Sequence, residues 1–135
     1  MSQENVEIVR RSREALQRGD IDAFLEGIDP GIEIDFSEVR GPNRGVFRGH
    51  DGARELFDSF WEAWESVRPL STDYIEVDDK VVLAGRSSFR GRGSGIEVEA
   101  GMGAVYTLQG GKIVRYKQFQ SRAEALEAAG LPNSG

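Results

Sequence analysis

The segment AVYTLQGGKIVR, residues 104–115, decides the fold. Apolar residues alternate with polar or small ones on both sides of Gly110 and Gly111. A two-residue glycine turn between two alternating segments predicts a tight β-hairpin. Just beyond the second strand, Ser121 and Glu124 have the spacing of a capping box, which predicts a short last helix. The C-terminal part of the chain is therefore expected to be a hairpin closed by a helix.

Upstream of this hairpin, apolar residues recur at every second position from about Pro69 onward. This period predicts strands near residues 72–77 and 81–89, followed by a long strand over residues 96–108 that leads into the hairpin. The glycine-rich stretch between the last two segments is typical of a turn. The second half of the chain is thus predicted to form an antiparallel meander.

The N-terminal half has the period of helices instead. Apolar residues at helical spacing over residues 6–16 predict a first helix that ends near Gly19, and Asp20 is placed to cap a shorter second helix. Residues 32–36 alternate as a half-buried strand, and a third helix with a broad aromatic stripe is expected from about Asp51. Helices that precede an antiparallel sheet indicate the α+β class.

Length, composition and charge narrow the classes of function. The 135 residues fit one domain, residues 1–135, and the lack of cysteine excludes disulfides and thiolate metal sites. A net charge of −6 without a basic cluster argues against nucleic-acid binding. No segment resembles a secretory signal or an apolar membrane span, so we expect a cytoplasmic protein without membrane contact.

Four further segments and their order resemble a known family. They are RGDIDAF (18–24), FRGHDGARELF (47–57), GGKIVR (110–115) and RAEALEAAGL (122–131). Together they are similar to the SnoaL-like branch of the nuclear transport factor 2-like and ketosteroid isomerase-like superfamily. The resemblance implies N-terminal helices packed in a strongly curved antiparallel sheet, a conical α+β barrel. It also implies a mostly apolar pocket and a homodimer formed through the outer side of the sheet.

The resemblance places the catalytic groups of ketosteroid isomerases at Ser12, Phe36 and Ala104. Phenylalanine and alanine exchange no protons, and a serine hydroxyl is a far weaker acid than a phenol. A classical ketosteroid isomerase is therefore not expected. Asp35 is out of phase with the apolar residues of its strand, so we expect it to point away from the pocket into solvent.

Other polar residues offer few catalytic groups. His50 is interpreted as a residue at the start of the third helix, with a base at the pocket mouth as the less favoured alternative. A single histidine excludes a multi-histidine metal site, and we expect neither metal nor cofactor. Glu97 and Glu99 lie opposite the apolar face of their strand, and Gln118 can hold a carbonyl group but cannot take its proton.

The aromatic stripe is interpreted partly as core and partly as a wall of the implied pocket. The residues expected to contact a ligand are Phe36, Phe57, Trp61, Trp64, Met102, Ala104, Tyr106 and Gln118. The leading hypothesis is a protein that binds a small, largely hydrophobic organic molecule. Two alternatives stay open: a cofactor-independent isomerase, cyclase, hydratase or hydrolase, and a non-catalytic dimerisation or accessory module.

Overall fold

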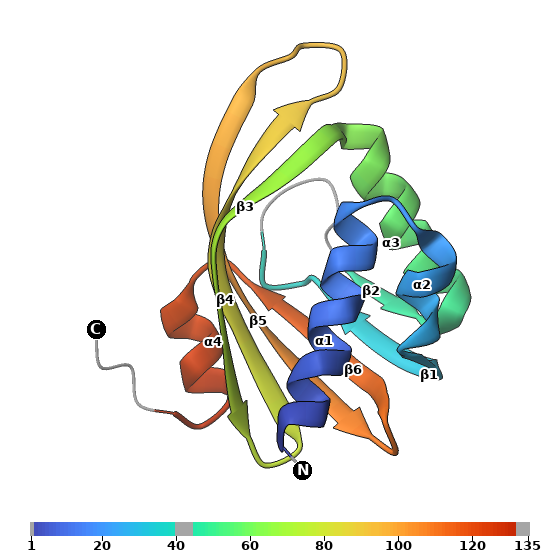
Figure 1. Cartoon of the computed structure of the whole chain (residues 1–135), viewed down its shortest axis with the longest axis vertical. Coiled ribbons are helices and arrows are strands. Elements are labelled where there is room, and N and C mark those ends of the chain that lie inside the picture. Colours follow the sequence, from blue (N-terminus) through green and yellow to red (C-terminus); the bar gives the residue numbers. More distant parts are fainter. Residues whose placement is uncertain (1, 40–44, 132–135) are drawn as a thin grey trace.

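The computed structural model describes residues 2–39 and 45–131 of the chain. Within these residues, helices and the strands of one sheet follow one another along the sequence, as Figure 1 shows. The elements are α1 (Ser2–Gln17), α2 (Ile21–Glu26), β1 (Ile28–Asp35), β2 (Val46–Arg48), α3 (Gly49–Ala63), β3 (Trp64–Val77), β4 (Lys80–Gly91), β5 (Glu97–Gln109), β6 (Lys112–Phe119) and α4 (Arg122–Ala128). The expected α+β class is confirmed.

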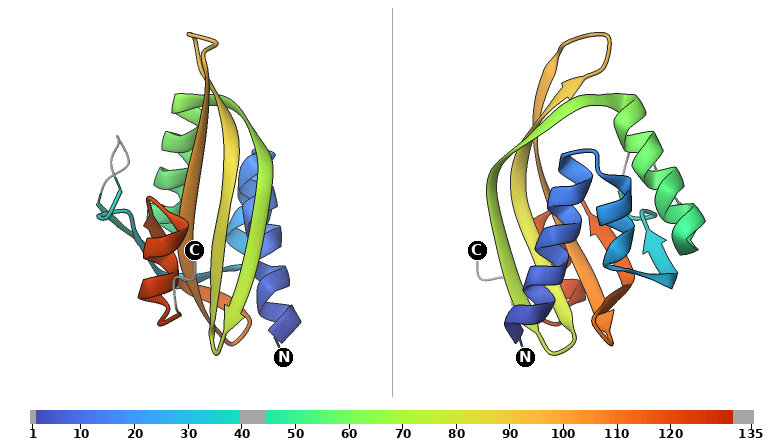
Figure 2. Two further views of the ribbon diagram at one scale, coloured as in Figure 1. Left: turned by 90° about the vertical axis from the view of Figure 1, so that its left-hand side faces the viewer. Right: turned by 45° about the vertical axis from the view of Figure 1, so that its right-hand side comes forward.

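The strands form one curved sheet with the order β2-β1-β6-β5-β4-β3. The long strands β3, β4 and β5 bend around α1, and the sheet does not close on itself (Figures 1 and 2). Pairing is antiparallel except between β1 and β6, which run parallel. This one pair differs from the expected antiparallel sheet, because β1 lies between β2, its antiparallel neighbour in sequence, and β6, a strand far along the chain.

The local signals in the sequence form the predicted elements. Gly110 and Gly111 both have positive φ, 60° and 80°, as a tight turn between right-twisted strands requires. Asp20 caps α2 by accepting a hydrogen bond from the amide of Ala23 at 3.1 Å. Ser121 Oγ accepts from the amide of Glu124 at 3.2 Å. The capping signals therefore mark the helix starts correctly.

Several features of the middle of the chain were not predicted, among them the short strand β2 (Val46–Arg48). The strand expected from residue 72 begins eight residues earlier, at Trp64, directly after α3. Arg92, in the turn between β4 and β5, donates hydrogen bonds to the carbonyls of Trp61 at 2.9 Å and Trp64 at 3.2 Å. This turn thus holds the carboxyl end of α3 in place, a contact between segments far apart in sequence. Gly41, Pro42 and Asn43, expected in a loop, lie outside the described residues.

Helices cover both faces of the sheet. Figure 2 shows α1, α2 and α3 on the concave face and the short α4 on the opposite face. The main core lies under α1 and includes Val9, Ile32, Ile34 and Leu83 among its most buried side chains. A second cluster lies between α4 and the outer face of β4, β5 and β6: Val82, Val105, Phe119, Ala125 and Leu126.

Gly103 allows α4 to approach the sheet. A Cβ atom added at Gly103 would overlap the carbonyl oxygen of Ser121 and lie 2.9 Å from Cβ of Ala125. Gly101 is on the same face of β5, yet a Cβ there would meet only the end of the Arg86 side chain at 3.2 Å. The lack of a side chain at Gly103 therefore allows packing within the chain, between β5 and α4.

We expect Gly103→Ala to lower the free energy of unfolding by about 1–3 kcal/mol, because the added methyl group forces backbone and α4 apart. Gly101→Ala is the matched control on the same strand and face, and its effect should stay within about 0.5 kcal/mol. Urea unfolding followed by circular dichroism measures both. Equal losses for the two variants would contradict the assigned role of Gly103.

Candidate functional site

An apolar cavity of about 170 Å³ lies between α1, α3 and the concave face of the sheet. We use this name for the space lined by Arg13, Leu16, Phe36, Leu56, Phe60, Phe89, Ala100, Gly101, Met102, Tyr116 and Gln118. Helices α1 and α3 provide one wall, and the end of β1 with strands β4, β5 and β6 provides the other. Carbon atoms make up most of this surface, which suits an apolar ligand body.

Three polar side chains interrupt the apolar lining: Arg13, Tyr116 and Gln118. The hydroxyl of Tyr116 donates a hydrogen bond of 2.7 Å to Oε1 of Gln118. One lone pair of the Gln118 carbonyl oxygen is therefore used, and its NH₂ group is left to donate. The Tyr116 ring also packs edge-on against Phe36, with ring centroids 5.6 Å apart.

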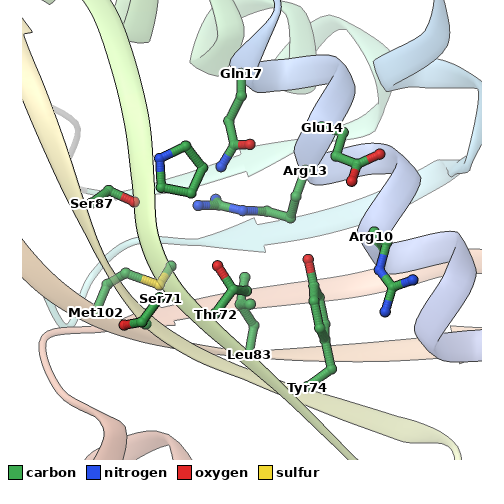
Figure 3. A pocket seen from close by; sticks show the side chains of 12 residues that line it. Arg10, Arg13, Glu14, Gln17, Ser71, Thr72, Tyr74, Leu83, Ser87 and Met102 are labelled. Carbon is green, nitrogen blue, oxygen red and sulfur yellow. The ribbon is translucent and has the colours of Figure 1, made fainter.

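A second space, the polar cleft, adjoins the apolar cavity. It has a volume of about 340 Å³ and shares Arg13 and Met102 with the cavity. Its remaining lining comes from α1, β3 and β4: Arg10, Glu14, Gln17, Pro69, Ser71, Thr72, Tyr74, Leu83, Gly85 and Ser87. Figure 3 shows the Arg13 side chain extending from α1 into this space, with the hydroxyl of Tyr74 directed toward it. Arg13 thus separates an apolar space from a polar one.

Arg13 carries a charge without a carboxylate partner among the described residues, since no ion pair to it is present there within 4.0 Å. Burial lowers the pKa of Arg13, but the oxygens of Tyr106, Tyr116 and Tyr74 around it outweigh burial, and the net pKa is raised. Arg13 is therefore a permanent cation at the floor of the cavity.

Tyr106 and Tyr116 stack with ring centroids 4.5 Å apart. Burial raises the pKa of both phenols, and that of Tyr106 lies well above its ordinary value, so both are neutral at physiological pH. The hydroxyl of Tyr106 is buried and has no hydrogen-bond partner in the described part of the chain. Ser12, Arg13 and both tyrosines border a void of only about 10 Å³ beneath the cavity. This void is too small for anything beyond about one water molecule.

The residues predicted to contact a ligand divide into two groups. Phe36, Met102 and Gln118 line the apolar cavity. Tyr106 lies one layer deeper, at the void, and Ala104 is fully buried in the sheet.

The aromatic residues expected on the third helix mostly form a second layer, and Trp64 begins β3 rather than belonging to α3. Phe57 is 7% exposed and packs against Phe24 with ring centroids 5.6 Å apart. Trp61 donates its indole N–H to the carbonyl of Leu16 at 3.0 Å and packs edge-on against Phe60. Trp64 packs against Phe89 with centroids 5.2 Å apart. The two tryptophans therefore support wall residues of the cavity rather than line it.

Asp35 is buried rather than exposed to solvent, at 8% exposure, which corrects that expectation. It does not line the apolar cavity. Its Oδ1 accepts hydrogen bonds from the amide and hydroxyl of Ser37 at 2.8 and 2.6 Å, and Lys117 Nζ lies 3.8 Å from Oδ2. Burial alone would raise the pKa of Asp35, but Ser37, Lys117 and Arg115 hold it below its ordinary value. An ionised carboxylate held in this way is not aimed at a ligand.

The remaining catalytic candidates have structural partners. His50 lies in the first turn of α3, where Nε2 donates to the carbonyl of Ile28 at 2.7 Å. Glu97 pairs with Arg90 at 3.3 Å and Glu99 with Arg86 at 3.4 Å, as the strand phase predicted.

Across residues 2–39 and 45–131, no group of acidic or histidine side chains has the arrangement of a metal site. No helix in that same part is both long and apolar enough to cross a bilayer.

Sequence reasoning missed Arg13, the most distinctive residue of the site. Its signal was nevertheless present: Val9, Arg13 and Leu16 are spaced by four and three residues, so the arginine occupies an apolar phase of α1. Phe89 and Leu56 were missed for another reason. Their place in the lining depends on how α3 crosses the curved sheet, which periodicity along one element does not specify.

Solved structures of other proteins have the same fold as this chain. An NTF2-like protein from Burkholderia thailandensis E264 is 29% identical, with a TM-score of 0.72 and coverage of 95% of this chain and 98% of the other. A candidate SnoaL-like polyketide cyclase from Jannaschia sp. CCS1 is 20% identical, with a TM-score of 0.76 and coverage of 97% and 94%. TerC co-crystallised with polyporic acid is 22% identical, with a TM-score of 0.76 and coverage of 92% and 96%.

Curated proteins give no match to this sequence. The family model of the SnoaL-like domain, in contrast, matches residues 9–116, from the middle of α1 to the middle of β6. This span includes every residue that lines the apolar cavity except Gln118. The chain belongs to the SnoaL-like domain family.

Proposed function

We propose that this protein binds a small, largely hydrophobic organic molecule in the apolar cavity. The observation that carries the proposal is the lining itself, in which aromatic and aliphatic side chains surround a space of about 170 Å³ with polar groups at one end. Apolar pockets with a few directed polar groups are the usual form of small-molecule sites. A cytoplasmic location is part of the proposal.

The walls suit a flat or aromatic ligand. Phe36 and Phe60 come from opposite sides, and each is braced edge-on by another ring, Tyr116 and Trp61 respectively. Met102 lies between the cavity and the polar cleft, where its flexible thioether can adapt to ligand shape. A braced aromatic wall loses little conformational entropy when a ligand binds.

Similar proteins support the same class of ligand. TerC, which shares the fold, was co-crystallised with the small molecule polyporic acid, and another relative is a candidate polyketide cyclase. Within the described chain, however, neither a carboxylate nor an imidazole lines the apolar cavity. Any catalysis would therefore use Arg13, Tyr116 and Gln118 to polarise a carbonyl group, which favours binding over proton transfer as the function of the site.

A homodimer formed through the outer face of the sheet is a second part of the proposal. The pairs Arg86–Glu99 and Arg90–Glu97 lie exposed on β4 and β5, beyond the area covered by α4. A surface with paired charges of both signs can pair with its own copy about a twofold axis.

To test binding, the neutral fluorophore N-phenyl-1-naphthylamine should show a saturable increase in fluorescence with the protein. Met102→Trp and Ala100→Leu, which both fill the cavity, should each raise Kd by about tenfold or more. Ile96→Trp, at a residue 64% exposed, is the control and should leave Kd unchanged. Non-saturable fluorescence, or equal affinity in all variants of retained melting temperature, would contradict the proposed site.

We also expect no useful isomerisation of a β,γ-unsaturated 3-ketosteroid. Ser12, Phe36 and Ala104 replace the three groups of that reaction, and each lost group removes about 10²-fold or more in rate. Absorbance of the conjugated product measures turnover. A rate within about two orders of magnitude of a competent isomerase would show that another residue supplies the base.

Light scattering at micromolar concentration tests the dimer. The expected mass is twice the chain mass of 14.9 kDa. Glu97→Arg with Glu99→Arg places like charges along the outer face of the strand and should shift the mass toward the monomer. A parent protein that is already monomeric would rule out this part of the proposal.

A further inference from the structure

The charge of Arg13 is not balanced by any group of the described chain. The residue is partly buried in the middle of α1, and it borders the apolar cavity, the polar cleft and the void beneath them. A charge removed from bulk water is costly unless a partner of opposite sign compensates it. Its neighbours among the aromatic residues, Tyr74, Tyr106 and Tyr116, are neutral phenols that solvate the cation without neutralising it.

The nearest charged groups do not alter this balance. Glu14 is exposed at the edge of the polar cleft, and Figure 3 shows its carboxylate on the side away from the Arg13 guanidinium. Arg10 adds positive charge nearby and is itself paired with Glu7 at 3.2 Å. On β3, Asp73 pairs with Arg122 of α4 at 2.8 Å, on the outer face of the sheet. The space around Arg13 is thus locally positive although the chain has a net charge of −6.

Two of the polar groups that line the apolar cavity are donors. The guanidinium of Arg13 has only N–H groups, and Gln118, whose carbonyl accepts from Tyr116 at 2.7 Å, also carries an NH₂ donor. Both residues line the apolar cavity together with its aromatic residues, so donors and a positive charge adjoin an aromatic surface. A ligand that satisfies them needs an acceptor oxygen with negative charge next to an apolar ring system.

We propose that Arg13 binds an anionic oxygen of the ligand, so that the protein prefers aromatic organic acids over neutral compounds of the same shape. The ring system would occupy the apolar cavity, and the acidic group, such as a carboxylate or a deprotonated enol or phenol, would pair with the guanidinium. This inference rests on the proposed function and specifies the ligand class of the same site.

Two fluorescent probes with one common skeleton test the inference. 1-Anilinonaphthalene-8-sulfonate and N-phenyl-1-naphthylamine share the phenyl and naphthyl rings, and only the first carries an anionic group. The parent protein should bind the sulfonate at least about tenfold more tightly than the neutral probe, as expected for a partly desolvated charge pair. A chain of negative net charge would give the opposite preference through its long-range field alone.

Variants of α1 locate the effect. Arg13→Met keeps the unbranched stem without the charge and should weaken sulfonate binding at least about tenfold, while affinity for the neutral probe stays within about threefold. Arg13→Lys should retain part of the preference. Arg10→Met, one turn away on the same helix, is the matched control for nearby positive charge and should change the ratio of the two affinities by less than about threefold.

The outcomes separate the two proposals. If the neutral probe binds saturably but the sulfonate binds no more tightly, the role of Arg13 is wrong and the apolar site stands. If the preference exists but persists in Arg13→Met, or is lost equally in Arg10→Met, the anion binds elsewhere and the inference is also wrong. If neither probe binds, both the proposed function and the inference fail. A parent protein without the preference for the sulfonate overturns the inference even where a variant does not fold.

Discussion

Burial of one face of α1 against the concave side of the sheet is the constraint on which the rest of the structure depends. Val9 and Leu16 of α1 belong to the same core as Ile32, Ile34 and Leu83 of the sheet, and each is nearly inaccessible to solvent. A long helix can fill a concave sheet only if the strands bend around it, and β3, β4 and β5 do so (Figure 2). Because α3 must then cover the remaining part of the concave face, the apolar cavity forms where the two helices and the sheet do not fill the space completely.

Arg13 is the exception within this packing. A hydrophobic side chain at this position of α1 would extend the core, and a well-packed apolar residue is often at least as stabilising as a partly buried charge. The guanidinium and the three tyrosines around it form a polar cluster within otherwise apolar packing, and the hydroxyl of Tyr106 has no hydrogen-bond partner in the described part of the chain. Residues that break the local pattern in this way are more common at binding sites than in cores, because function can require a group that stability disfavours.

The chemistry available at the cavity follows from which groups are present and where they point. Phe36 faces the cavity, whereas its neighbour Asp35 is tied to Ser37 and Lys117 and stays ionised. Gln118 offers donors and its neighbour Tyr116 is a neutral phenol. A cavity with donors and a fixed cation can orient a carbonyl or hold an anion, and none of its described lining residues is a carboxylate or an imidazole that could move a proton. This chain therefore combines the fold of the SnoaL-like family with a cavity whose polar groups are an arginine, a tyrosine and a glutamine.

The sequence by itself determined most of the secondary structure and its class. Gly110 and Gly111 specify the hairpin, Asp20 and Ser121 start their helices, and the change from helical to alternating period places helices before the sheet. These signals are local, so they can be read from neighbouring residues. The parallel pairing of β1 with β6, the early start of β3 at Trp64 and the placing of Trp61 behind the cavity wall were decided only by the tertiary structure. Each depends on contacts between segments far apart in the chain. For the same reason, the position of Arg13 on the apolar face of α1 was visible in the sequence. Its unpaired charge between the apolar cavity and the polar cleft depends on the curved sheet, so it could be recognised only in the tertiary structure.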